Sequence, residues 1–215
     1  MSQRPTLTGV LEAAPVVAMI RRISKPRLES TVLALAAAGL RAIEITLDTD
    51  GAMETIERCR ESLPDNVLIG AGTVLDAQSA RQAIAHGAQF LVSPHLDQQL
   101  LDVSNNAGVD TLCGALTPTE ILTAWRSGAT LVKVFPVASV GGAEYIRALR
   151  GPLPDVPLVP VGGVRVDDVA AYREAGAIAV GLGSALVVKE DVVGGSFDRV
   201  ASRARAALEG AVGRP

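Results

Sequence analysis

Lys133 is the residue of this sequence whose surroundings most favour chemistry. It lies in the centre of an apolar run at 131–135, LVKVF, whereas the other two lysines, Lys25 and Lys189, lie in polar segments. If the run is a buried strand, alternation places Lys133 on the same face as Phe135. Burial lowers the pKa of an amine by up to about 3–5 units, and about 3.4 units would bring it from about 10.4 to neutrality at pH 7. A neutral amine beside a cavity can attack a carbonyl group and form a Schiff base; a lysine that extends its amine to solvent, or a buried ion pair, would explain the same pattern.

Glu44 is a second charged residue in a run that should be buried. It lies in the middle of AIEIT, at 42–46. This run is the second strand candidate and the run around Lys133 is the sixth, and alternate strands of a barrel contribute to the same interior layers. We therefore expect Glu44 and Lys133 to lie close together. A plain salt bridge explains that pair, and so does a carboxyl group of raised pKa that serves as general acid and base.

Two glycine-rich segments follow the seventh and eighth apolar runs and are suited to binding a phosphate. They read PVGGV at 160–164 and GLGSA at 181–185. Barrels that bind phosphate do so in the loops after strands seven and eight, with backbone N–H groups and the N-terminus of a short helix directed at the anion. Ser184 is placed to begin such a helix. Glycines that only turn the chain are the simpler alternative; the candidate phosphate ligands are Gly162, Gly163, Gly183 and Ser184.

Candidates for holding a carboxylate lie after the first and third apolar runs. Arg21 is the first charged residue after the run at 15–20, where a guanidinium could bind a carboxylate through two N–H groups. We expect the adjacent Arg22 to point the other way, and a surface position for Arg21 explains the sequence equally well. The run GAGT at 70–73 ends in Thr73, whose hydroxyl and N–H could also contact a ligand, although glycine-rich strand ends are common.

These residues need a scaffold that brings strand ends together, and the rest of the chain supplies one. Eight short apolar runs alternate with eight helical patterns, of which several end just before a glycine; the runs are 15–20, 42–46, 67–73, 90–92, 111–113, 131–135, 158–161 and 179–182. Alternation of this kind indicates parallel strands. We predict a single (β/α)8 TIM barrel over residues 1–215, with a short N-terminal helix. A doubly wound open sheet is the competing architecture, but the Gly-x-Gly-x-x-Gly fingerprint is absent after the first run.

Composition excludes several classes of function. The 215 residues carry a formal net charge of −3, so no overall basic field would attract nucleic acid or an anionic membrane. No apolar stretch reaches the length of about 18 residues that spans a bilayer, and the N-terminus lacks the apolar core of a signal peptide. Two cysteines and two histidines without paired spacing give no metal cluster. We expect a cytoplasmic protein that needs neither metal nor cofactor.

Taken together, these motifs resemble those of the class I 2-keto-3-deoxy-6-phosphogluconate (KDPG) aldolases, which include members that also act on 4-hydroxy-2-oxoglutarate. The matching segments occur in order over about residues 16–190 and read VVAMIR, AIEITL, IGAGTVL, QFLVSPHLD, LTPTE, ATLVKVFP, VPVGGV and VGLGSAL. The resemblance implies a homotrimer of (β/α)8 subunits that binds a small 2-keto acid. It also implies cleavage of a phosphorylated sugar acid to pyruvate and glyceraldehyde 3-phosphate.

The resemblance assigns roles residue by residue. Lys133 would be the Schiff-base lysine and Glu44 the proton shuttle, and Arg21 and Thr73 would hold the pyruvate carboxylate. The remaining roles are pocket lining by Pro94 and Phe135 and phosphate binding by Gly162, Gly163 and Ser184.

One position departs from the pattern of some members of this family. They carry an arginine two residues after the threonine of the Glu-x-Thr segment, where this chain has Asp48. Other members lack that arginine and use the arginine at the end of the first strand, so the resemblance implies this role for Arg21. Because of this departure, the gluconate and galactonate forms of the substrate and hydroxy-oxoglutarate are not separated by the sequence.

Two other functions compatible with the sequence stay open. A different phosphate-binding barrel, such as a phosphoribosyl isomerase or a thiamine-phosphate synthase, would use the same glycine loops but needs no buried lysine in strand six. A non-catalytic barrel that senses a phosphosugar would bind without releasing pyruvate.

Overall fold

The computed structural model describes residues 5–212, and its framework is one sheet of eight parallel strands. Neighbouring strands follow the chain order from β1 to β7, and β1 also pairs with β8. The strands are β1 (Val16–Ile20), β2 (Ala42–Thr46), β3 (Leu68–Gly72), β4 (Phe90–Val92), β5 (Asp110–Ala115), β6 (Leu131–Val134), β7 (Leu158–Pro160) and β8 (Val180–Leu182). Each lies within one residue or two of the apolar run that predicted it.

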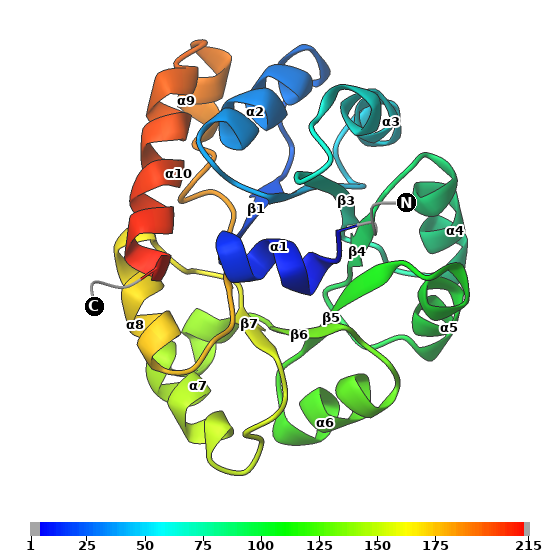
Figure 1. Cartoon of the computed structure of the whole chain (residues 1–215), viewed down its shortest axis with the longest axis vertical. Coiled ribbons are helices and arrows are strands. Elements are labelled where there is room, and N and C mark those ends of the chain that lie inside the picture. Colours follow the sequence, from blue (N-terminus) through cyan, green and yellow to red (C-terminus); the bar gives the residue numbers. More distant parts are fainter. Residues whose placement is uncertain (1–4, 213–215) are drawn as a thin grey trace.

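Helices follow the strands around the outside of this sheet (Figure 1). The helices are α1 (Leu7–Ala13), α2 (Lys25–Ala37), α3 (Ala52–Ser62), α4 (Ala77–Ala85), α5 (Gln98–Ala107), α6 (Pro118–Arg126), α7 (Ala143–Arg150), α8 (Val169–Glu174), α9 (Lys189–Val193) and α10 (Phe197–Val212), with the short 3-10 segments η1 (Val137–Val140) and η2 (Val166–Asp168). Local signals set several boundaries. At α6, for example, the Thr117 hydroxyl accepts from the backbone N–H of Glu120, whose carboxylate accepts from the N–H of Thr117.

The sheet closes on itself between β7 and β8. A single bridge joins Val161 to Gly181, and the N–H of Ile178 donates to the carbonyl of Leu158 at 3.0 Å. Closure leaves all eight strands paired on both sides, which an open sheet cannot achieve. The predicted (β/α)8 barrel is therefore confirmed, and the doubly wound alternative is wrong.

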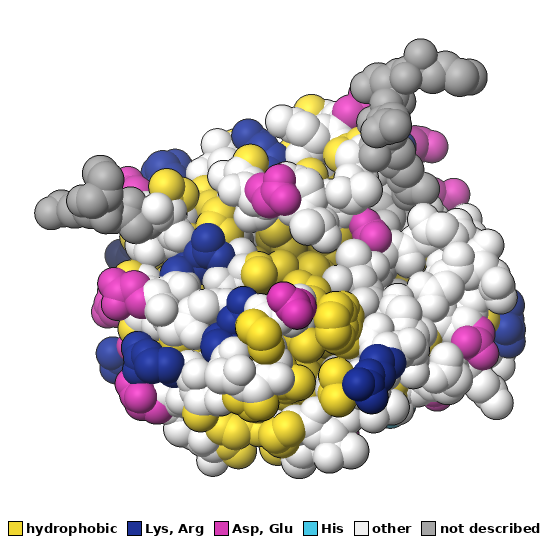
Figure 2. Space-filling model, turned by 60° about the horizontal axis from the view of Figure 1, so that its bottom comes forward, with side chains coloured by type: hydrophobic (Ala, Val, Ile, Leu, Met, Phe, Trp, Pro, Cys, Tyr) yellow, Lys and Arg dark blue, Asp and Glu magenta, His cyan; other side chains and the backbone are white. Residues whose placement is uncertain are grey.

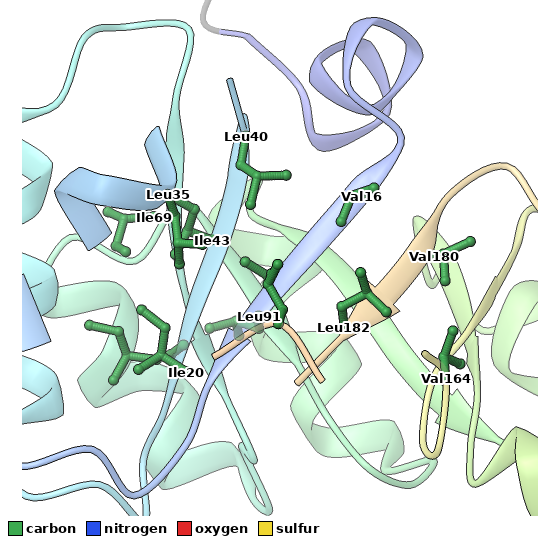
Figure 3. Close-up of a cluster of buried hydrophobic side chains, with 14 of the residues drawn as sticks. Val16, Ile20, Leu35, Leu40, Ile43, Ile69, Leu91, Val164, Val180 and Leu182 are labelled. Carbon is green, nitrogen blue, oxygen red and sulfur yellow. The ribbon is translucent and has the colours of Figure 1, made fainter. Parts of the chain in front are cut away.

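Strand alternation divides the buried side chains into two layers. One layer lies between strands and helices; it contains Val16, Ile43 and Ile69 from adjacent strands and Leu35 from α2 (Figure 3). The other fills the inside of the barrel, where Phe90 is the bulkiest of the fully buried side chains. With so few aromatic residues, branched aliphatic side chains supply most of the packing in both layers.

The short helix α1 covers one end of the barrel, as Figure 1 shows by its position across the centre of the ring. Its side chains Leu7, Val10 and Leu11 belong to the interior layer and pack at the amino ends of the strands. Asp110, the first residue of β5, accepts a hydrogen bond from the N–H of Leu7 at 2.7 Å. Among residues 5–212, α1 therefore covers the interior at this end, and the carboxyl ends of the strands form the end that a ligand would enter. Among the helices described, none has the length and apolarity needed to cross a membrane.

Candidate active site

A cavity of about 990 Å³ opens at the carboxyl ends of the strands. Its wall is made of strand ends and the loops that follow them, which is where barrel enzymes carry their chemistry. Every residue that the sequence predicted for the site contributes to this wall, namely Arg21, Glu44, Thr73, Pro94, Lys133, Phe135, Gly162, Gly163, Gly183 and Ser184. The fold thus brings together residues that lie up to 163 positions apart, between Arg21 and Ser184.

Lys133 projects from β6 into the cavity floor. Strand pairing places it beside Gly114 of β5 and Val159 of β7, and its side chain is almost fully buried, with 6% exposed. The ammonium nitrogen lies 4.9 Å from the centre of the Phe135 ring. Burial lowers the pKa of this amine, the negative charge of Glu44 opposes the shift, and the positive charge of Arg21 adds to it. The structure therefore provides the desolvated amine that the sequence predicted.

Glu44 projects from β2 into the same cavity and is 1% exposed. Burial raises the pKa of its carboxyl group from 4.5 to about 7, even though the charges of Lys133 and Arg21 act in the opposite direction. Its Oε2 has no hydrogen-bond partner among the described residues. A carboxyl group with this pKa exchanges a proton readily near neutral pH, which suits it to general acid and base catalysis.

Gly72 of β3 makes room for that carboxyl group. A Cβ atom at this position would lie 2.6 Å from both Cδ and Oε1 of Glu44. The sequence pattern only weakly indicated a ligand site at the glycine-rich end of β3, and the structure shows that this strand end has a packing role.

Lys133 and Glu44 influence each other without forming a direct ion pair. Each shifts the pKa of the other by its charge, yet none of the ion pairs within residues 5–212 joins them. A closed salt bridge would occupy both groups and hold both in their charged forms. The plain salt-bridge interpretation of this pair is therefore wrong for this structure.

Arg21 and Arg22 lie at the rim beyond Glu44, and both line the cavity. The expectation that Arg22 points the other way is wrong, because β1 ends at Ile20 and the backbone of Arg22 is left-handed, with φ of 52°. Strand alternation no longer applies there. Both guanidinium groups reach Asp48 in the loop after β2, at 3.1 Å.

Thr73 and Pro94 complete the wall on the side of β3 and β4. Thr73 and Arg22 are the two non-glycine residues with positive φ in the described part of the chain, and both lie at this rim. Such backbone strain is concentrated at functional sites in general. Pro94 lies against β5, where a Cβ atom on Gly114 would approach the Pro94 carbonyl carbon to 2.1 Å.

The glycine loops after β7 and β8 form a further part of the cavity wall. Gly162 and Gly163 adopt positive φ angles of 92° and 77°, which side chains rarely tolerate. No backbone carbonyl in residues 5–212 accepts a hydrogen bond from the amides of Gly163 or Ser184. Gly163 and Ser184 are exposed and line the cavity, so these donors are accessible to an anion that enters it.

The prediction that Ser184 begins a helix is wrong. The segment after β8 makes one tight turn, in which the N–H groups of Leu186 and Val187 both donate to the carbonyl of Gly183, and helix α9 begins only at Lys189. The turn keeps Ser184 at the cavity wall through its backbone shape. Ser184 lies at the cavity wall as predicted, but no helix N-terminus at Ser184 provides the N–H groups of the site.

Two cations at the cavity rim were missed by the sequence analysis. Arg165, in the loop after Gly163, lines the cavity and pairs with Asp168 at 3.3 Å, and Lys189 lines it at the start of α9. Arg165 could have been found as the first charged residue after the PVGGV segment. Lys189 is exposed and has charged neighbours in the sequence, and only the closure of the barrel shows that this segment borders the cavity. The described residues hold no cluster of three or more side chains suited to a metal ion.

Fold and site define the class of this protein: a (β/α)8 barrel with a buried lysine and a buried glutamate in a cavity closed by two glycine loops. Comparison with known proteins agrees with this class. The family model "KDPG and KHG aldolase" matches residues 7–202. This chain therefore belongs to the KDPG and KHG aldolase family, whose members are lyases.

Individual relatives span nearly the whole chain. A 2-dehydro-3-deoxy-phosphogluconate aldolase from Pseudoalteromonas atlantica is 34% identical over 180 residues, 84% of this chain and 83% of the relative. A probable 2-dehydro-3-deoxy-6-phosphogalactonate aldolase from Rhizobium meliloti is 37% identical and covers 80% of this chain and 81% of its own. The crystal structure of a KDPG aldolase from Legionella pneumophila, with pyruvate captured as a covalent carbinolamine, has a TM-score of 0.85 at 27% identity and covers 96% of this chain and all of that one.

Proposed function

We propose that this protein is a Schiff-base aldolase that cleaves 2-keto-3-deoxy-6-phosphogluconate to pyruvate and glyceraldehyde 3-phosphate, with all 215 residues in one domain. The single observation that carries the proposal is that Lys133 and Glu44 are both buried in the same cavity and form no salt bridge with each other. Family membership favours this reaction over that of a phosphoribosyl isomerase, a thiamine-phosphate synthase or a sensing barrel.

The first half of the reaction builds the Schiff base. The lone pair of neutral Lys133 attacks the C2 ketone of the substrate. A proton then passes from the attacking nitrogen to the former carbonyl oxygen, relayed by Glu44, to give a neutral carbinolamine. Protonated Glu44 donates its proton to the departing hydroxyl, so that water leaves and an iminium remains. A pKa of about 7 lets Glu44 act as acid here and as base in the next step.

The second half breaks the carbon–carbon bond. Glu44, now ionised, accepts the proton of the 4-hydroxyl group, the C3–C4 bond breaks, and its electron pair neutralises the iminium to give an enamine and the aldehyde product. Protonation of the enamine at C3 and addition of water to C2 then release pyruvate and restore the free amine of Lys133. No external oxidant or reductant is required.

The two ends of the cavity orient the substrate for these steps. Arg21 and Thr73 are suited to the carboxylate next to the ketone, and Pro94 and Phe135 flank the chain between the two ends. The amides of the glycine loops and Ser184 are suited to the terminal phosphate. Because the phosphate is remote from the breaking bond, its binding energy contributes to orientation.

Reductive trapping tests the central step. Borohydride reduces an iminium to a stable amine, so incubation with pyruvate and borohydride should add one reduced pyruvate unit to the protein. Peptide mass spectrometry should place this unit on Lys133, and Lys133→Ala should remain unmodified. An active preparation in which Lys133 carries no adduct would refute the proposal.

The galactonate form of the substrate is the second candidate. The Rhizobium relative carries that name, and this chain has Asp48 rather than an arginine after β2. Hydroxy-oxoglutarate is a third possible substrate, which would present a carboxylate in place of the phosphate. Pyruvate release from the three substrates, measured with lactate dehydrogenase as the coupling enzyme, separates them by kcat/KM.

We further propose a homotrimer located in the cytoplasm. Hydrophobic side chains gather on the side of the molecule that Figure 2 brings forward, among scattered charges of both signs. Exposed hydrophobic residues include Trp125 on α6 and Leu75 after β3. Both cysteines are free and buried, which suits a reducing compartment. Light scattering after size exclusion should give three times the chain mass of 22.2 kDa.

A further inference from the structure

Asp48 gathers the two rim arginines onto a single oxygen atom. Its Oδ2 accepts from Nε of Arg21 at 3.1 Å and lies 3.1 Å from Nη2 of the same guanidinium, and Nε of Arg22 donates to it at 3.1 Å. The side chain of Asp48 is 28% exposed, whereas those of Arg21 and Arg22 are 54% and 71% exposed. The carboxylate is therefore the fixed point of this cluster, and the long arginine side chains are held by it.

The geometry of the Arg21 contact leaves part of its guanidinium free. A guanidinium has five N–H groups, arranged along a side edge that contains Nε and Nη2 and an end edge that contains Nη1 and Nη2. Asp48 uses the side edge. The end edge keeps its N–H groups. Arg21 lines the same cavity as Glu44 and Lys133, whose pKa values both respond to its charge.

Arg22 makes the net charge of this part of the rim positive. If Asp48 faced Arg21 alone, the pair would carry no net charge and would not attract an incoming carboxylate. With Arg22 on the same oxygen, the three groups carry one net positive charge. The left-handed backbone of Arg22 is what turns its side chain toward Asp48.

We propose that Asp48 is a positioning residue, which holds the end edge of Arg21 toward the cavity so that it binds the carboxylate of the 2-keto acid, with Arg22 as the counter-charge that keeps the rim positive. This inference rests on the proposed function, since it requires that Arg21 binds that carboxylate. Asp48 acts through Arg21 and need not touch the substrate.

The test uses pyruvate alone, which has the keto acid but no phosphate. If the enamine forms, the pyruvate methyl protons exchange with deuterated water, and NMR follows this exchange over a range of pyruvate concentrations. Asp48→Ala should raise the half-saturating pyruvate concentration about tenfold, the loss expected for a hydrogen bond between charged groups, and leave the maximal exchange rate within about threefold. Arg22→Gln should raise half-saturation about threefold by lowering the rim charge.

A double variant separates positioning from a general structural effect. Because Asp48 acts through Arg21, adding Asp48→Ala to Arg21→Gln should change half-saturation no further. A further increase in the double variant, or an unchanged half-saturation in Asp48→Ala, would overturn the inference. If Arg21→Gln itself has no effect, the carboxylate role assigned to Arg21 under the proposed function fails, and the role of Asp48 fails with it.

Two controls guard the interpretation. Asp168→Asn removes the carboxylate charge from the other arginine–aspartate pair at the rim, Arg165 with Asp168, and should leave half-saturation for pyruvate unchanged because that pair lies at the glycine-loop end. Asp48→Leu keeps the approximate size of the side chain without a hydrogen-bond acceptor if the alanine variant folds poorly, and it should still weaken pyruvate binding. Borohydride trapping at saturating pyruvate checks that Lys133 is intact in every variant.

Discussion

At the scale of single residues, burial shifts the pKa values of Lys133 and Glu44 toward neutral pH from opposite sides. The pKa of the Lys133 amine falls and that of the Glu44 carboxyl group rises to about 7, and in both cases desolvation is the largest cause. Each group is thereby less fully charged near neutrality than it would be in water. An amine that must attack and a carboxyl group that must both give and take a proton need this condition.

The pH dependence of catalysis should follow Glu44. Retro-aldol cleavage needs its ionised form to accept the 4-hydroxyl proton, so kcat/KM should fall as the pH drops through about 7. Glu44→Gln should lower kcat by about 100-fold or more, within the range usual for loss of a general base, and weaken pyruvate binding far less. Steady-state rates between pH 5 and 9 check this; a wild-type rate that stays level down to pH 5 would contradict the role of Glu44.

The raised pKa of Glu44 also has a consequence for stability. Between pH 4.5 and about 7 the folded chain holds this proton more tightly than the unfolded chain, so the contribution of Glu44 is fully present below pH 4.5 and is lost as the pH rises through 7. The loss amounts to about 3 kcal/mol at 1.36 kcal/mol per pKa unit. Relative to wild type, Glu44→Gln should gain up to this amount between pH 4.5 and 8, as measured by urea unfolding. A difference between the two proteins that does not vary with pH would show that Glu44 is not titrating in this range.

At the scale of elements, strand β3 shapes the site because two of its residues are glycines, which have no side chain. Gly70 and Gly72 point to the same side of the strand, where one makes room for the ring of Phe90 and the other for the carboxyl group of Glu44. The strand therefore fits a bulky core residue and a catalytic candidate side by side.

Alanine at these two glycines should separate packing from catalysis. Either Cβ would lie 2.6 Å from its neighbour, so both variants should lose about 1–3 kcal/mol of stability through overpacking. Only Gly72→Ala displaces Glu44, and it should lower kcat by at least about tenfold, the effect expected when a catalytic group is misplaced by about 1 Å. Gly70→Ala is the matched control and should keep kcat within about threefold at a temperature where both are folded; equal losses of kcat would refute the distinction.

At the scale of the whole molecule, the barrel has one end for stability and one for chemistry. Helix α1 seals the amino end, fixed by the hydrogen bond from Leu7 to Asp110, which also accepts from the hydroxyl of Thr130 at 3.1 Å. The cavity lies at the other end. Because the packed interior lies between the two ends, substitutions at the amino end should change the free energy of unfolding without changing kcat/KM.

Asp110→Ala tests this division. It removes the acceptor of the Leu7 N–H and should cost about 1–3 kcal/mol, which lowers Tm by about 2–4 °C per kcal/mol for a chain of this size. We expect kcat/KM to stay within about twofold of wild type. Asp102→Ala on the exposed surface of α5 is the control, and its stability should change by less than about 0.5 kcal/mol. A large loss of activity in Asp110→Ala at a temperature where it is fully folded would contradict the division.

Much of the fold and the centre of the site could be read from the sequence, because both depend on local periodicity. The eight apolar runs mark the strands, and the two-residue repeat within a strand places Lys133 and Glu44 on the interior face whatever the rest of the chain does. Glycine pairs after the last two runs mark the loops at the open end. These signals need no knowledge of contacts between distant residues.

The remaining features were decided by tertiary structure, because they depend on contacts that no local pattern encodes. The turn of Arg22 toward the cavity and the partnership of Asp48 with two arginines join residues 26 and 27 positions apart, across strands β1 and β2. The turn at Ser184 and the approach of Lys189 to the rim follow from the way the barrel closes. Sequence by itself determined which residues face inward. The folded chain determined how closely they approach and what charge surrounds them, since desolvation and distance are properties of the packed molecule.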